Sequence, residues 1–192
     1  MGKPVLVIVN GLPGTGKTTL SRRLAADLKL PVFGRDSLYE TLYDALEGQA
    51  NDRQSRLGHA SFALLYHVAD TILAADKSLI VEGFFGNIEL RSAEFLQLQQ
   101  RTDLAPLQIL CHADGELLLE RFLARMESSE RHGGHQDRKW LEQHKERLLR
   151  GQLAPLKLAG QLLEIDTTAP HSSAYAKLLG QVQRVLANGH SL

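Results

Sequence analysis

Eight consecutive residues near the start of the chain have the types and the spacing needed to hold phosphate groups. Residues 11–18 read Gly-Leu-Pro-Gly-Thr-Gly-Lys-Thr and match the pattern G-x-x-x-x-G-K-[ST] of a Walker A loop. In such a loop the glycines let backbone N–H groups converge on the β-phosphate, the lysine reaches the β- and γ-oxygens, and the threonine hydroxyl coordinates Mg²⁺. We therefore expect a nucleoside triphosphate site in which Lys17 is catalytic and Thr18 is a metal ligand. The nucleotide-binding residues predicted here are Gly11, Pro13, Gly14, Thr15, Gly16, Lys17, Thr18 and Thr19.

The residues on either side of this loop predict the elements that position it. The β-branched run at 5–9 indicates a buried strand, and Leu20, Leu24 and Leu28 form the i, i+4, i+8 stripe of a packed helix. The loop then lies at a helix N-terminus, where unpaired N–H groups and the helix dipole favour an anion. A glycine-rich turn with an unrelated lysine is the alternative, and the strand before and the helix after favour the phosphate loop.

Two carboxylates are candidates for the chemistry that follows binding. Asp36 comes directly after a short apolar segment at 32–33, and it could accept a proton from a substrate hydroxyl or serve as the N-cap of the next helix. Glu82 closes the apolar run at 79–81, where a Walker B acid would hold Mg²⁺ through water. Solvation of a strand end is the alternative for Glu82. Because ligands gather at the carboxyl ends of parallel strands, both side chains are expected to face Lys17.

Three arginines could neutralise the charge of a phosphoryl group in transfer. Arg125 and Arg131 are predicted to be catalytic, whereas Arg121 is equally well explained as a solvated surface charge. The polar, glycine-containing segment 127–137 indicates a mobile loop, and His132 and His135 within it suit a phosphate or substrate contact better than a metal site.

These candidates require elements that alternate along the chain. Apolar segments predict parallel strands at 5–10, 32–33, 79–81, 107–111 and 162–165. Amphipathic patterns predict helices at 18–28, 37–48, 59–75, 114–126, 140–150 and 175–186. Near-continuous apolar strands separated by such helices are typical of an α/β fold with helices on both faces of the sheet.

Length and charge limit the classes of function. The 192 residues predict one domain without a linker, and the formal net charge of zero argues against a surface that follows long nucleic acid or an anionic membrane. Without a signal segment or a long apolar stretch, we expect a cytoplasmic protein with no membrane partner. The single cysteine, Cys111, ends a strand and is expected to be structural. No feature of the sequence indicates an oligomeric state.

Several segments together resemble a known group of enzymes. GLPGTGKTTLSRRLA, FGRDS, LIVEGFF, ERFLAR and LLEIDTT are similar to the compact P-loop kinases of the nucleoside-monophosphate-kinase-like group, and most of all to the AAA_33 or zeta-toxin-like small kinases. That set includes polynucleotide kinase, chloramphenicol phosphotransferase and gluconate-kinase relatives. The resemblance implies a three-layer P-loop NTPase fold, a five-stranded parallel sheet in the order 2-3-1-4-5 and a lid over about 126–138.

The resemblance also suggests a reaction. We expect a kinase that uses ATP and Mg²⁺ and transfers the γ-phosphoryl group to a hydroxyl of a small-molecule acceptor, with Asp36 as the acceptor base. The acceptor pocket is expected from residues 39–57 and 84–90. Alternatives are a nucleic-acid 5′-hydroxyl kinase, a nucleotide-sugar kinase or a non-catalytic ATP-binding regulatory module. Polynucleotide kinases carry an arginine three residues after the aspartate, and here that position is Tyr39.

Overall fold

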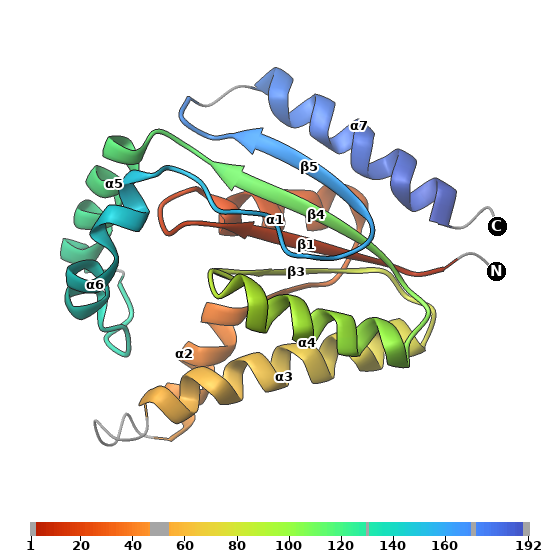
Figure 1. Ribbon diagram of the computed structural model, residues 1–192, viewed down its shortest axis with the longest axis horizontal. Coiled ribbons are helices and arrows are strands. Elements are labelled where there is room, and N and C mark those ends of the chain that lie inside the picture. The colour runs from red at the N-terminus through yellow and green to blue at the C-terminus, as the bar shows by residue number, and fades with distance from the viewer. Residues whose placement is uncertain (1–2, 47–53, 130, 170–171, 190–192) are drawn as a thin grey trace.

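Five parallel strands form the centre of the protein, which is described by a computed structural model over residues 3–46, 54–129, 131–169 and 172–189. Their order across the sheet is β2-β3-β1-β4-β5, and every neighbouring pair is parallel, as the sequence predicted (Figure 1). The strands are β1 (Val5–Gly11), β2 (Val32–Gly34), β3 (Leu79–Gly83), β4 (Ala105–His112) and β5 (Gln161–Asp166).

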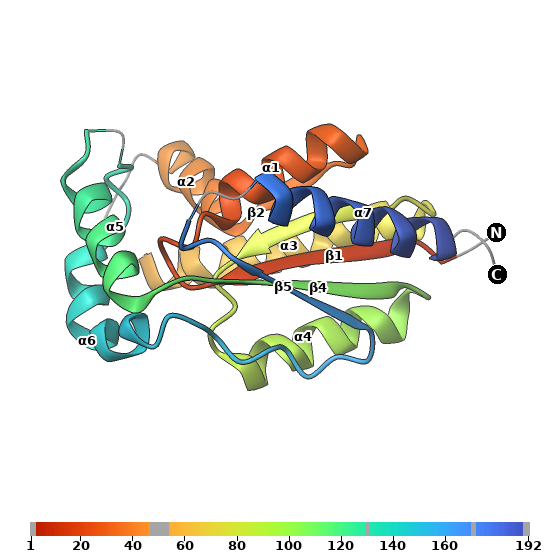
Figure 2. The same cartoon turned by 90° about the horizontal axis from the view of Figure 1, so that it is seen from above.

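Helices connect the strands and cover both faces of the sheet. They are α1 (Lys17–Leu28), α2 (Arg35–Ala45), α3 (Gln54–Ala74), α4 (Ile88–Arg101), α5 (Gly115–Glu127), α6 (Asp137–Leu149) and α7 (Ser172–Gly189). Figure 2 shows α1 and α7 above the sheet and α4 below it. No helix in the described ranges is long and apolar enough to cross a membrane.

Side chains that alternate between the two faces of β1 explain the three layers, a sheet with helices on each side. Val5, Val7 and Val9 pack against α1 and α7, whereas Leu6 and Ile8 pack against α3 and α4. All seven residues of this strand are buried, because helices cover it on both sides. The near-continuous apolar sequence of the strand is the direct consequence.

A third apolar cluster lies beyond the carboxyl ends of the strands. Leu118 and Phe122 of α5 pack there with Leu148 of α6 and with Leu12 of the phosphate loop. The arrowheads of β4 and β5 in Figure 1 point toward α5 and α6. This cluster therefore attaches the segment predicted as a lid to the end of the sheet where ligands bind in such folds.

The sequence analysis missed α4. Its buried residues Ser92, Phe95 and Leu98 form a helical stripe, but Leu90 and Leu96 are 42% and 39% exposed and blur the pattern. Other helices begin earlier than predicted: α3 at Gln54, α6 at Asp137 and α7 at Ser172. The predicted end of the second helix at Gly48 lies outside the described residues.

Cys111 is structural, as the sequence suggested. The thiol is fully buried in β4, and burial raises its pKa to about 12. A thiol that stays protonated at neutral pH is a poor nucleophile.

Candidate active site

The phosphate loop joins the end of β1 to the first turn of α1 and depends on its glycines. Gly14 and Gly16 have φ angles of 87° and 68°, a left-handed conformation that side chains disfavour. At Gly11 a Cβ atom would lie 2.7 Å from the carbonyl oxygen of Cys111. Thr15 closes the turn, because its N–H and its hydroxyl both donate to the Leu12 carbonyl, at 3.2 and 2.8 Å. The predicted loop is thus preformed at a helix N-terminus.

The two predicted metal ligands lie next to each other at the base of this loop. The Thr18 hydroxyl donates to Glu82 Oε2 at 2.7 Å, although the two residues are 64 positions apart. Glu82 lies within β3, which continues through Gly83. A hydroxyl beside a carboxylate is a hard oxygen pair of the kind that Mg²⁺ prefers when water and phosphates complete its shell. The residues present therefore fit Mg²⁺.

Burial sets the electrostatics of this pair. Glu82 is 2% exposed, and burial raises the pKa of its carboxyl although Lys17 and the Thr18 hydrogen bond act in the opposite direction. Lys17 is 6% exposed and is the first residue of α1. Lys17 and Glu82 therefore lie close enough at the base of the phosphate loop for their charges to interact.

The structure does not support a capping role for Asp36. The N-cap of α2 is Gly34, which has an extended conformation, and Asp36 lies inside the first turn of the helix. Its Oδ1 atom accepts a hydrogen bond from Arg35 Nη1 at 3.0 Å. Burial alone would raise the pKa of Asp36, but Lys17 and Arg35 together hold it below its ordinary value. Asp36 is therefore an ionised carboxylate that faces the phosphate-loop lysine.

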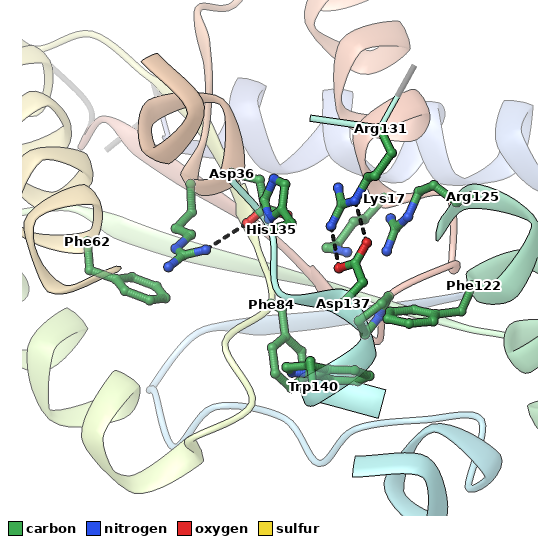
Figure 3. A pocket seen from close by; sticks show the side chains of 12 residues that line it. Lys17, Asp36, Phe62, Phe84, Phe122, Arg125, Arg131, His135, Asp137 and Trp140 are labelled. Atoms are coloured by element: carbon green, nitrogen blue, oxygen red, sulfur yellow. Dashed lines mark hydrogen bonds and ion pairs between the residues drawn. The ribbon is translucent and has the colours of Figure 1, made fainter. Parts of the chain in front are cut away.

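A cavity of about 230 Å³ collects most of these groups (Figure 3). Lys17, Asp36, Arg125 and Arg131 line it, so all four predicted catalytic residues share one space. Aromatic side chains make up much of the remaining wall, and Figure 3 shows Phe84 and Trp140 together on one side. The two predicted metal ligands, Thr18 and Glu82, line an adjoining cavity. Asp36, Arg125 and Arg131 border both cavities.

The two predicted catalytic arginines have different environments. Arg131 forms two hydrogen bonds with Asp137, whereas the Nε of Arg125 is buried with no hydrogen-bond partner in the described structure. Burial, and then the charge of Arg131, lower the pKa of Arg125. A guanidinium remains charged even so. An unpartnered donor is costly when buried, which makes Arg125 ready to receive an anion.

Arg121 is not a solvated surface charge. It donates to the Gly14 carbonyl in the phosphate loop at 3.3 Å and to the Thr167 carbonyl after β5 at 3.1 Å. The arginine thus ties the phosphate loop to the end of the last strand. The sequence analysis left this residue open, because sequence spacing does not place α5 next to either segment.

The segment between α5 and α6 packs on α2. Three hydrogen bonds between described residues join them: Tyr39 Oη to the Gly134 carbonyl at 2.8 Å, His132 Nε2 to Asp44 Oδ1 at 2.9 Å, and His135 Nε2 to Glu40 Oε1 at 2.7 Å. Within the described ranges, no group of three histidine, cysteine, aspartate or glutamate side chains is arranged to hold a metal. The histidines therefore hold the segment against α2 in this structure.

Sequence reasoning missed the aromatic wall. Phe62, Phe84, Phe122 and Trp140 reach the cavity from α3, the β3–α4 connection, α5 and α6. The ring centroid of Trp140 lies 5.2 Å from that of Phe122 and 5.6 Å from that of Phe84, so Trp140 packs α6 against its neighbours and also lines the cavity. Of the segments expected to form the acceptor pocket, Phe84 lines this cavity, and residues 47–53 are not among those described.

Comparison with solved structures supports the fold. A protein from Chloroflexus aurantiacus that carries the name "putative kinase" is 38% identical, with a TM-score of 0.86 over 95% of this chain and 98% of that one. A gluconokinase from Sinorhizobium meliloti is 18% identical, with a TM-score of 0.55 over 97% and 95% of the two chains. At that identity the second likeness concerns the fold alone.

Curated sequence relatives match part of the chain. Uncharacterised proteins of Mycobacterium tuberculosis and Mycobacterium bovis are 28% identical over 127 residues, which is 62% of this chain. The chain spans 25% of the length of these curated relatives. The family model AAA_33, described as an AAA domain, matches residues 6–149. The chain therefore belongs to the AAA_33 family and has a P-loop, kinase-like fold.

Proposed function

We propose that the protein is a kinase that transfers the γ-phosphoryl group of ATP to a hydroxyl of a small-molecule acceptor. One observation carries the proposal: the phosphate-loop lysine, an arginine whose buried Nε has no hydrogen-bond partner among the described residues, and an ionised aspartate line the same cavity. Such a kinase needs positive charge at the transferring phosphoryl group and a carboxylate at the acceptor hydroxyl. We assign the positive charge to Lys17 and Arg125 and the carboxylate to Asp36.

The phosphate side of the site is assigned to the loop and its neighbours. The loop backbone and Lys17 hold the β- and γ-phosphates. Thr18 and Glu82 would hold Mg²⁺, which neutralises phosphate charge when bound. Arg125 and Arg131 contact the equatorial oxygens of the γ-phosphoryl group, since both border the cavity on the side of Lys17 (Figure 3).

The acceptor side is assigned to Asp36. Arg35 occupies Oδ1, and Oδ2 receives the hydroxyl of the acceptor. The hydroxyl oxygen forms a bond to the γ-phosphorus as the bond to the bridging oxygen of ADP breaks, and the hydroxyl proton passes to Asp36. Because its lowered pKa makes Asp36 a weak base, its main effect is orientation of the hydroxyl, with proton transfer late in the reaction.

Access of water decides whether ATP is hydrolysed instead. The 131–136 segment packs on α2 and contributes Arg131 and His135 to the wall of the cavity. We propose that this segment is the lid, and that its closure excludes water and brings Arg131 to the phosphoryl group.

The test is a search for the product. Wild-type protein is incubated with ATP and Mg²⁺ and with pooled sugars, polyols, nucleosides and short oligonucleotides, and mass spectrometry identifies compounds that gain a phosphoryl group. Lys17→Ala protein is the blank. A phosphorylated small molecule that is absent from the blank supports the proposal, and phosphorylated oligonucleotide alone contradicts the assigned acceptor class. Saturable ATP binding without any product contradicts the kinase function.

A further inference from the structure

The cavity that holds Asp36 continues into a second one. An outer cavity of about 320 Å³ shares Arg35, His135, Asp137 and Trp140 with the inner cavity. We call the two the inner and the outer chamber. The outer chamber is also lined by Tyr39, Gly134, Gln136, Lys139 and Gln143. Because the two chambers share four lining residues, they adjoin each other, and the outer one lies next to the space assigned to the reacting hydroxyl.

The outer chamber is separate from the groups that hold phosphate. Pro13, Lys17 and Arg125 line the inner chamber but not the outer one. The triphosphate therefore belongs to the far side of the inner chamber. What enters the outer chamber is the part of the acceptor that lies away from the reacting hydroxyl.

The outer chamber carries an excess of positive charge. Its lining includes the side chains of Arg35 and Lys139 and a single carboxylate, that of Asp137. Both oxygens of Asp137 are engaged by Arg131, at 2.5 and 2.6 Å. The carboxylate thus has little capacity to neutralise Lys139, whereas Arg35 shares its charge with Asp36 of the inner chamber, and the neutral amide of Gln143 adds donors without charge.

Arg35 is held in place with donors to spare. Its guanidinium lies 5.0 Å from the ring centroids of both Tyr39 and Phe62, and only its Nη1 atom meets Asp36. The Nε atom is buried without a hydrogen-bond partner in the described structure. A fixed guanidinium with remaining donors is well suited to a second oxyanion, because it can bind two anionic oxygens at once.

On the basis of the proposed function, we infer that the acceptor is an elongated hydroxy compound with an anionic end. Its hydroxyl lies at Asp36 in the inner chamber, and its carboxylate or phosphate monoester lies in the outer chamber against Arg35 and Lys139. Trp140 borders both chambers and contacts the carbon chain between the two ends. A neutral acceptor offers no anion to Lys139 or to the remaining donors of Arg35.

Matched acceptors test the inference. Each set shares one hydroxylated carbon chain that ends in a carboxylate, a phosphate monoester or a neutral amide, and transfer from ATP is measured for all three. Because a hydrogen bond to a charged group stabilises by more than a neutral one, the preferred anionic compound is expected to exceed its amide in kcat/KM by about 10–100-fold. The better of the two anionic arms identifies the anionic group.

A charge reversal locates the anionic end. Lys139→Glu is expected to reduce the anionic-to-neutral ratio of kcat/KM by about tenfold or more, through KM for the anionic acceptor, while KM for ATP is unaffected. Lys145→Glu is the matched control, since Lys145 is an exposed lysine on the same helix that lines neither chamber. Calorimetric ATP binding to both variants verifies that they are folded.

Two results would overturn the inference, and only the second would also overturn the proposed kinase function. Equal use of anionic and neutral acceptors, or an equal effect of Lys139→Glu and Lys145→Glu, contradicts the anionic end and leaves the kinase function intact. Transfer to none of the compounds and to none of the pooled acceptors, with ATP binding intact, contradicts the kinase function and the inference together.

Discussion

Arg131 and Asp137 form a two-point ion pair beside the cavity. Arg131 Nε lies 2.5 Å from Asp137 Oδ2, and Nη2 lies 2.6 Å from Oδ1. The side chains are 16% and 11% exposed, so the pair is largely shielded from water. Because two parallel hydrogen bonds fix a planar guanidinium in direction as well as position, Asp137 determines where Arg131 points. Asp137 is therefore a positioning residue for Arg131.

Asp137→Asn is expected to slow transfer more than it weakens ATP binding. The amide cannot hold the guanidinium at two points, and loss of orientation at the transferring group lowers kcat by about 10–100-fold. Steady-state kinetics and calorimetric ATP binding measure the two effects separately. Glu142→Gln, an exposed acid on the same helix, is the control. An unchanged kcat in Asp137→Asn contradicts the role assigned to the pair.

Asp36→Asn is expected to leave ATP affinity nearly unchanged. Asparagine keeps the shape of the side chain but neither attracts the hydroxyl proton nor accepts it, so kcat falls by about 10²–10⁴-fold. The measurement is single-turnover transfer at saturating ATP. If ATP affinity falls as much as the transfer rate, Asp36 serves the nucleotide site and not the acceptor.

Glu82→Gln is expected to make the protein inactive and more stable. Burial raises the pKa of Glu82 above its ordinary value of 4.5, so its contribution to stability is fully present below that pH and is lost as pH rises through the raised pKa. Near neutral pH the buried charge lowers the free energy of unfolding. The Glu82→Gln substitution removes this charge and therefore raises the free energy of unfolding. Each gain of about 1 kcal/mol raises Tm by about 2–4 °C.

Thermal unfolding without nucleotide, from about pH 4 to pH 8, checks the sign of this effect. The Tm advantage of Glu82→Gln over wild type should grow as pH rises and vanish at the acid end. Glu142→Gln should show no such trend. A Glu82→Gln protein that is less stable than wild type near pH 8 shows that the ionised carboxylate is stabilising in the fold.

Tyr39→Phe is expected to loosen the segment between α5 and α6. The variant removes the hydrogen bond from the buried Tyr39 hydroxyl to the Gly134 carbonyl, which contributes about 1 kcal/mol. Limited proteolysis with trypsin should then cleave faster after Arg131 or Arg138. Tyr43→Phe is the matched control, because it retains the ring contact with His132. Equal cleavage rates in the two variants would show that this hydrogen bond does not hold the segment against α2.

The sequence predicted the parts of the protein that depend on local pattern. Glycine spacing identified residues 11–18, and apolar runs identified all five strands, because both signals come from neighbours in the chain. Asp36 and Glu82 followed from their places at strand ends. The pattern did not predict the partners of these carboxylates, which are Arg35 for Asp36 and Thr18 for Glu82.

The rest of the site depends on contacts between distant elements. Phe62 and Trp140 come from α3 and α6, and no periodicity says that their rings face one cavity. Arg121 contacts a carbonyl 107 positions away. The N-cap of α2 shows the same limit at short range, since Asp36 and Gly34 are both accepted cap residues and only the backbone decides between them.

The fate of the γ-phosphoryl group distinguishes transfer to an acceptor from hydrolysis of ATP. With γ-labelled ATP, Mg²⁺ and pooled hydroxy compounds, the label is partitioned among ATP, inorganic phosphate and organic phosphate, for wild type and for Lys17→Ala. Wild type is expected to place most of the transferred label in organic phosphate, and Lys17→Ala is expected to place almost none there. If the label is released only as inorganic phosphate, or stays in ATP that is demonstrably bound, the protein is not a kinase for these acceptors.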